Sequence, residues 1–188
     1  MEIFDLYDID RIKTGETMER GGVCPEGRFR MVVHISIINS EGKMLIQKRQ
    51  PFKHGWSGLW DVTAGGSAVA GENSRQAAER ELFEEIGLKI EFSERRPAFT
   101  VNFRDGFDDN YVLTKDVDIS ALKLQPEEVE AVKWADFEEI CKMIDDGTFI
   151  PYHKSYISLL FDMANGSDSH KRGAPAGIVT PKVTYGIK

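Results

Sequence analysis

Three glutamates in the stretch GGSAVAGENSRQAAERELFEEIGL (residues 65–88) lie close enough in sequence to act on one ligand: Glu81, Glu84 and Glu85. Residues three and four apart share one face of a helix, so these like charges would repel one another there. A hard divalent cation would remove the conflict, because carboxylate oxygens are the ligands that Mg²⁺ prefers. The alternative is an acidic helix face that simply meets water, as most charge runs do. This pattern by itself leaves both interpretations open.

A helix of about three turns is expected to position these glutamates. Asn73 or Ser74 can cap its start, and Gly87 suits the left-handed residue that follows a helix end. Its apolar positions repeat with helical spacing, which predicts one face packed against the core. That face consists of Ala78, Leu82 and Ile86.

The rest of the chain alternates between short strands and helices. Residues 29–39 and 43–49 read as a β-hairpin. Further strands are expected at residues 59–64, 97–103, 111–117 and 129–135, with a polar turn at residues 104–110. Two helices are expected at residues 136–147 and 153–164. This order of elements predicts an α/β domain with a mixed β-sheet.

Composition narrows the classes of function. The chain has 188 residues and a net charge of −7, which suits one domain and disfavours general affinity for nucleic acid or anionic membranes. No apolar run is long enough to span a membrane, and the N-terminus is acidic where a signal peptide would be basic. A cytoplasmic protein is expected. The two cysteines, Cys24 and Cys141, form neither a disulfide framework nor a metal knuckle.

The glutamates belong to a longer pattern with fixed spacing. It runs Gly66, five residues, Glu72, seven residues, Arg80, Glu81, Leu82, one residue, Glu84, Glu85, one residue, Gly87, Leu88. Every fixed position of the Nudix box is matched, so the chain resembles a Nudix hydrolase. Flanking features extend the resemblance to about Asp162.

The resemblance implies the Nudix fold, an α/β/α sandwich with a mixed β-sheet, over residues 1–164. Residues 1–28 are expected to form an N-terminal hairpin region, and residues 165–188, rich in Gly, Ser, Pro and Lys, a mobile tail. The resemblance also implies a Mg²⁺ site, with Mn²⁺ as a substitute. Its expected ligands are the Gly65 carbonyl and the carboxylates of Glu81, Glu84 and Glu85.

The expected chemistry is hydrolysis of a phosphoanhydride bond in a small-molecule diphosphate, such as a nucleoside diphosphate linked to a group X. Catalytic roles are implied for Glu72, Arg80, Glu81 and Glu128, with Arg80 pairing with Glu72 to orient the loop. A general base should deprotonate the attacking water. Glu127, Glu128 and Glu130 are the candidates, and Glu128 fits best.

The runs LIQKRQPFKHGWSGLWD and DLYDIDRIKTGETMERG look most like the subgroup related to isopentenyl-diphosphate isomerase. In that isomerase the residues resembling Arg49 and Lys53 help to hold the diphosphate, so both are candidate substrate-binding residues. An isomerase relative is therefore one alternative function. The isomerase, however, needs a cysteine and a histidine at the positions of Gly65 and Ser67, and Arg30 replaces one of its metal-binding histidines.

A sensor that binds a nucleotide diphosphate without cleaving it is the alternative from another class. Such sensors commonly have an eroded box and an attached DNA-binding domain, and neither feature is seen here. The sequence leaves group X and the oligomeric state open, and a homodimer is compatible with it.

Overall fold

The structure, a computed structural model, describes residues 2–166. The tail expected over residues 165–188 therefore lies outside the described residues, apart from its first two positions. Within residues 2–166, no helix combines the length and the apolar character that a membrane span requires.

A seven-stranded mixed sheet forms the centre of the fold. Its main path has the order β5-β4-β3-β8-β7, with β6 paired to β3 and β9 paired to β4. The strands β3 and β8 run parallel, and every other pair is antiparallel. The strand bounds are β3 Arg30–Ile38, β4 Met44–Arg49, β5 Trp60–Asp61, β6 Ala64–Ser67, β7 Phe99–Phe103, β8 Gly106–Thr114 and β9 Val129–Ala135.

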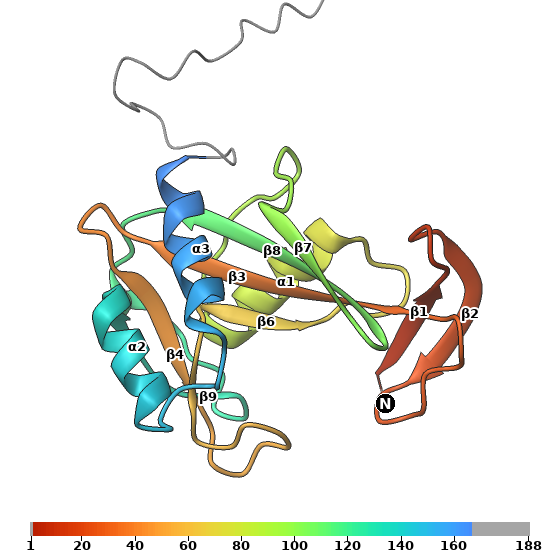
Figure 1. Ribbon diagram of the computed structural model, residues 1–188, viewed down its shortest axis with the longest axis horizontal. Helices are drawn as coiled ribbons and strands as arrows, with labels where there is room; N and C mark the ends of the chain where they lie inside the picture. Colours follow the sequence, from red (N-terminus) through yellow and green to blue (C-terminus); the bar gives the residue numbers. More distant parts are fainter. Residues whose placement is uncertain (1, 167–188) are drawn as a thin grey trace, which may run out of the picture.

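Helices cover both faces of this sheet, which confirms the expected α/β/α sandwich (Figure 1). The helix α1 (Ser74–Ile86) packs on one face, while α2 (Phe137–Asp145) and α3 (Lys154–Asn165) pack on the other. A short 3₁₀ turn, η1 (Ile119–Ala121), precedes β9. The alternation of β4 explains the two layers, because Leu45 joins the α1 core while Met44 and Ile46 join the α2–α3 core.

The N-terminal segment forms a two-stranded antiparallel hairpin beside the sheet, from β1 (Ile3–Tyr7) and β2 (Lys13–Glu19) (Figure 1). Its apolar side chains Phe4, Leu6 and Tyr7 are buried. Tyr7 meets the ring of Phe107 edge-on, with ring centroids 5.2 Å apart. The hairpin is therefore docked on the domain through its own apolar face.

One expectation about the sheet is wrong. The polar turn predicted at residues 104–110 is confined to its first positions, because β8 already begins at Gly106. Asp109 and Asn110 are buried within the strand. Each polar side chain has a partner there, since Arg11 donates to Asp109 and Tyr156 donates to Asn110. Residues far away in the sequence supply the partners that make this buried polar strand possible, and a prediction from neighbouring residues does not include them.

The Arg11–Asp109 ion pair should hold the hairpin on the sheet. The guanidinium contacts both oxygens of Asp109, at 2.9 and 2.8 Å, and lies 4.1 Å from the centroid of the Phe107 ring. An Arg11→Met variant would leave the buried carboxylate with the Thr100 hydroxyl alone. We expect the free energy of unfolding, measured with urea, to fall by about 1–3 kcal/mol.

The matched control is Arg104→Met, since Arg104 is exposed and, within residues 2–166, pairs only with its neighbour Asp105. It should leave the unfolding midpoint nearly unchanged. Equal midpoints for Arg11→Met and wild type would contradict the role of the ion pair.

Candidate active site

The helix that carries the glutamates has the predicted boundaries. Asn73 caps α1 by accepting hydrogen bonds from two backbone N–H groups, and Gln76 completes the capping box. Gly87 ends the helix in the left-handed region, with φ 72°. The predicted apolar face is buried, which directs the neighbouring side of the helix toward the loop after β6. The buried face consists of Ala78, Leu82 and Ile86.

The three glutamates differ in exposure. The side chain of Glu81 is 13% exposed and that of Glu84 is 49% exposed, while Glu85 as a residue is only 3% exposed. All three line one small cleft together with Gly65 and Gly66. The sequence pattern placed them on one stripe, and the structure brings them together, with Glu84 at the rim.

Glu85 is the most deeply buried carboxylate of the cleft. Its Oε2 accepts hydrogen bonds from Gln47 Nε2 at 2.8 Å and from the Gly65 backbone N–H at 3.1 Å. Burial, together with the charge of Glu81, raises the pKa of Glu85 to about 7. The cleft thus holds more negative charge than its own hydrogen bonds compensate.

Glycine is required at both Gly65 and Gly66 of β6, because other groups lie too close to the backbone there to leave room for a Cβ. A Cβ at Gly66 would overlap the carboxylate of Glu81. A Cβ at Gly65 would lie 2.6 Å from Cδ2 of His34, on the neighbouring strand β3. Neither position can carry a side chain without displacing a polar group, Glu81 in the cleft or His34 on the opposite face of the sheet.

Arg80 connects the loop to the glutamates. It forms a two-pronged ion pair with Glu72, with Nε–Oε1 at 2.7 Å and Nη2–Oε2 at 3.0 Å. Nη2 also donates to the Ser67 carbonyl at 3.0 Å. Nη1 donates to Glu81 at 2.9 Å and to Glu84 at 3.0 Å. One guanidinium therefore fixes the loop backbone, the loop glutamate and two cleft carboxylates.

The N-terminal hairpin holds the same loop from its other side. Asp5 Oδ2 accepts from the Gly71 backbone N–H at 2.8 Å and from Lys13 Nζ at 2.6 Å. Lys13 Nζ also donates to the Glu72 carbonyl at 2.9 Å. The loop between β6 and α1 is thus held between Arg80 and the hairpin.

Basic and acidic side chains form the opposite wall of the cleft, which encloses about 90 Å³. Lys53 forms an ion pair with Glu128, and Gln125 lies beside them. Burial, followed by the charge of Arg49, lowers the pKa of Lys53. Glu2 and Arg20 of the hairpin region complete the wall. Sequence reasoning assigned neither a role, although Arg20 lies in the run DLYDIDRIKTGETMERG that resembles the isomerase-related subgroup.

The two predicted diphosphate-binding residues lie in different places. Lys53 lies in the cleft, whereas Arg49 packs behind it, with Nη1 3.7 Å from Asp61 Oδ2. The buried Nε of Arg49 has no hydrogen-bond partner among the described residues. Arg49 is therefore positioned to influence the charge of the cleft, but it does not line the cleft.

The cleft can supply metal ligands of the right chemistry, although its carboxylates are engaged by cations. Among residues 2–166, no three acidic, histidine or cysteine side chains converge closely enough to hold a metal ion. The reason is visible in the contacts, because Arg80 binds Glu81 and Glu84 while Lys53 binds Glu128. Carboxylate oxygens fit Mg²⁺ or Mn²⁺. A cation would have to take over contacts that Arg80 now makes.

Comparison with known proteins decides the family. The sequence model described as "NUDIX domain" matches residues 28–157. A protein of Listeria monocytogenes named as an uncharacterised Nudix hydrolase is 44% identical over 170 residues, covering 90% of this chain and 99% of its own. The chain belongs to the Nudix family. Members of this family act on compounds that contain a diphosphate, and the chain is accordingly a Nudix hydrolase.

One more distant relative and one solved structure are also similar to this Nudix chain. An isopentenyl-diphosphate Δ-isomerase of Pectobacterium atrosepticum is 29% identical, covering 72% of this chain and 76% of its own. A crystal structure of a Deinococcus radiodurans protein has a TM-score of 0.67 at 24% identity, covering 85% of this chain and 97% of its own. The first confirms that isomerase relatives exist, and the second confirms the fold.

The face of the sheet under α3 carries a polar group of residues that sequence reasoning did not identify as a set. His34 Nδ1 lies 2.9 Å from Asp108 Oδ2. Burial lowers the pKa of His34, but the carboxylate of Asp108 outweighs this effect and raises it to about 9. The Tyr152 hydroxyl donates to Asp61 at 2.9 Å. These residues lie on four separate strands and loops, so no local motif could have brought them together.

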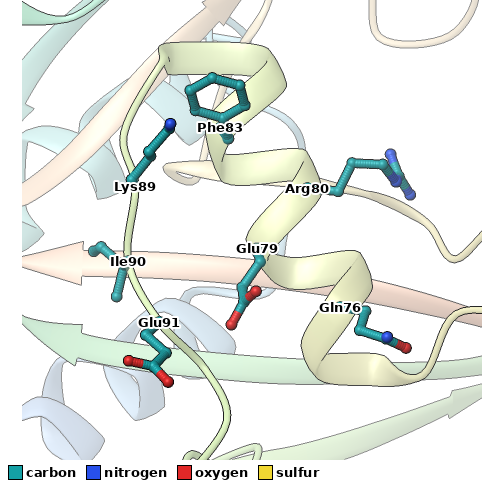
Figure 2. A pocket seen from close by; sticks show the side chains of 7 residues that line it. All are labelled: Gln76, Glu79, Arg80, Phe83, Lys89, Ile90 and Glu91. Atoms are coloured by element: carbon teal, nitrogen blue, oxygen red, sulfur yellow. The ribbon is translucent and has the colours of Figure 1, made fainter.

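The outer side of α1 has a separate hollow (Figure 2). Glu79 and Phe83 face Lys89 and Ile90 there, and Arg80 also lines the hollow, although its guanidinium end is directed to the other side of the helix (Figure 2). The Lys89 ammonium lies 4.9 Å from the centroid of the Phe83 ring. This side of the Nudix helix therefore differs in chemistry from the acidic cleft and contains none of the three glutamates.

A Gly66→Ala variant should weaken metal binding. Its new methyl group would displace the carboxylate of Glu81, so we expect Mg²⁺ or Mn²⁺ affinity, measured by titration calorimetry, to fall by about tenfold or more. Gly166→Ala is the matched control, because a Cβ at Gly166 meets no atom of residues 2–166 within 4 Å. The assignment of Glu81 to the metal site fails if Gly66→Ala binds the cation as tightly as Gly166→Ala.

Proposed function

We propose that this Nudix hydrolase uses Mg²⁺, with Mn²⁺ as a substitute, to cleave a phosphoanhydride bond in a nucleoside diphosphate linked to a group X, or in a similar organic diphosphate. The observation that carries the proposal is the composition of the cleft. Carboxylates of α1 form one wall, while the other contains the cations Lys53 and Arg20, each paired with a carboxylate, Glu128 and Glu2 respectively. An anionic diphosphate and a divalent cation would each find complementary charge there.

The chain would hold the cation through Glu81, Glu84 and Glu85, with the Gly65 carbonyl beside them. When bound, a divalent cation would neutralise the diphosphate charge and acidify an attacking water. Arg80 and Glu72 act as positioning residues, because their contacts fix the loop and the carboxylates.

Glu128 is the proposed general base. It lies in the wall opposite α1, where it would accept the proton of the attacking water once Lys53 turns to the substrate. Glu130 instead pairs with Lys48 at 3.0 Å, and Glu127 is exposed. Water oxygen would bond to one phosphorus as the bridging P–O bond breaks, giving X-phosphate and a second phosphate-containing product.

Isomerase activity is disfavoured by the geometry beside Gly65. The isomerase cysteine would stand at this position, and any side chain there would overlap His34. Ser67 occupies the place of the required histidine, and its hydroxyl accepts a hydrogen bond from Arg30 at 3.0 Å. The proton donor that double-bond migration needs is therefore missing from the metal side.

The test is a substrate panel with Mg²⁺: nucleoside diphosphate sugars, dinucleoside polyphosphates, nucleoside triphosphates and isopentenyl diphosphate. We expect phosphate-containing hydrolysis products from at least one compound. Glu85→Gln should lower that rate by about a hundredfold or more, because charge stabilisation at the reacting phosphate is lost. Glu94→Gln, an exposed glutamate outside the cleft, should retain the wild-type rate.

Running the isopentenyl diphosphate reaction in deuterated water separates the two enzyme classes. Recovery of unlabelled starting material is the expected result. Deuterium-labelled dimethylallyl diphosphate would establish an isomerase and overturn the proposal, as would full activity of Glu85→Gln.

A further inference from the structure

Arg30, at the start of β3, is a half-buried cation without a carboxylate partner. Its Nη1 donates to the Ser67 hydroxyl at 3.0 Å, and its guanidinium lies 5.2 Å from the centroid of the Phe103 ring. Among residues 2–166 it forms no ion pair. A desolvated charge with only neutral partners is costly, so a compensating anion is expected at such a position.

Arg30 lines a second cavity, of about 320 Å³, next to the acidic cleft. Ser67 and Arg20 line both spaces, so the two adjoin at these residues. Arg20 belongs to the turn that follows β2, and Gly21 and Gly22 of the same turn also border the cavity. The second cavity is thus formed between the N-terminal hairpin region and the sheet.

The charge in this cavity is mostly positive. Its one acidic side chain, Asp105, is already held by Arg104 through both oxygens, each at 2.9 Å. Burial lowers the pKa of Arg30, while the nearby charge of Asp105 opposes this effect and that of Arg20 adds to it. Arg20 is paired with Glu2, with Nη1 2.7 Å from Oε2, so Arg30 is the cation of this cavity that has no ion pair within residues 2–166.

The second cavity lies beside the cleft, where a single diphosphate could place one phosphate in each space. Ser67 directly follows Gly66 and its side chain points to the opposite face of β6 from the Glu81 carboxylate, but Ser67 and Arg20 border both the cleft and the second cavity. A phosphate at Arg30 and Ser67 would therefore lie next to one held at the glutamates. Guanidinium groups bind phosphate oxygens in pairs, which suits this subsite better than an ammonium would.

We propose that Arg30, Arg20 and the Ser67 hydroxyl form a phosphate subsite, which binds the phosphate of the substrate that is farther from the glutamates. The proposal rests on the proposed diphosphate hydrolysis. It also gives the N-terminal hairpin region a direct part in substrate binding, although the family match begins only at residue 28.

Binding of inorganic pyrophosphate without metal tests the subsite separately from turnover. We expect calorimetry to show that Arg30→Gln weakens pyrophosphate binding by about tenfold or more, the scale of a lost charged hydrogen bond. Arg30→Lys should restore part of this affinity. Arg28→Gln is the matched control, because Arg28 lies two residues away and pairs with Glu16 on the surface. It should bind like wild type.

Steady-state kinetics with the panel compound that is hydrolysed fastest test the subsite a second time. Arg30→Gln should raise KM by about tenfold with kcat nearly unchanged, since the subsite contributes binding rather than charge stabilisation at the reacting phosphorus. Circular dichroism checks that the variant folds. If it does not fold, Arg20→Gln replaces it, because the Arg20 side chain is 61% exposed and tolerates substitution.

The possible results distinguish failure of the subsite from failure of the proposed function. Unchanged pyrophosphate affinity in folded Arg30→Gln, or in Arg20→Gln where that variant replaces it, overturns the subsite even if the enzyme hydrolyses diphosphates normally. Loss of affinity with no turnover of any panel compound supports the subsite and contradicts the proposed function instead.

Discussion

The Arg80 guanidinium is the interaction on which the rest of the site depends. Its five N–H groups have five acceptors: two on Glu72, one on the Ser67 carbonyl, and one each on Glu81 and Glu84. Because the group is planar and rigid, these acceptors are fixed relative to one another. A cluster of carboxylates that would otherwise repel is thereby held beside the glycine loop, on the side of α1 away from the hollow of Figure 2.

The sheet and the hairpin determine what this cluster can meet. The strand β6 brings the loop backbone to Glu85, and the Asp5–Lys13 pair ties the loop to the hairpin. The same hairpin region contributes Arg20 to the cleft. Elements far apart in the sequence thus place positive charge opposite the carboxylates, which is the arrangement that a bound metal and a diphosphate require.

The parts of this arrangement that are local in sequence could be predicted. The cap at Asn73, the left-handed Gly87 and the apolar face of α1 follow from neighbouring residues, and all three predictions are confirmed. The polar start of β8 could not be predicted, because Asp109 is satisfied by Arg11, 98 positions away in sequence. The same holds for the surroundings of Arg30, which forms no ion pair within residues 2–166; that becomes evident only when its neighbours are known.

The central claim is that Arg80 orders the cleft for catalysis, and the turnover number at saturating Mg²⁺ tests it most directly. In Arg80→Lys, the ammonium cannot make the two-pronged contact with Glu72, so we expect kcat to fall by about tenfold or more while the fold is kept. Arg75→Lys is the control, since Arg75 lies on the same helix and its side chain hydrogen-bonds only the Ser93 carbonyl among the described residues. Equal kcat values for Arg80→Lys, Arg75→Lys and wild type would contradict this account.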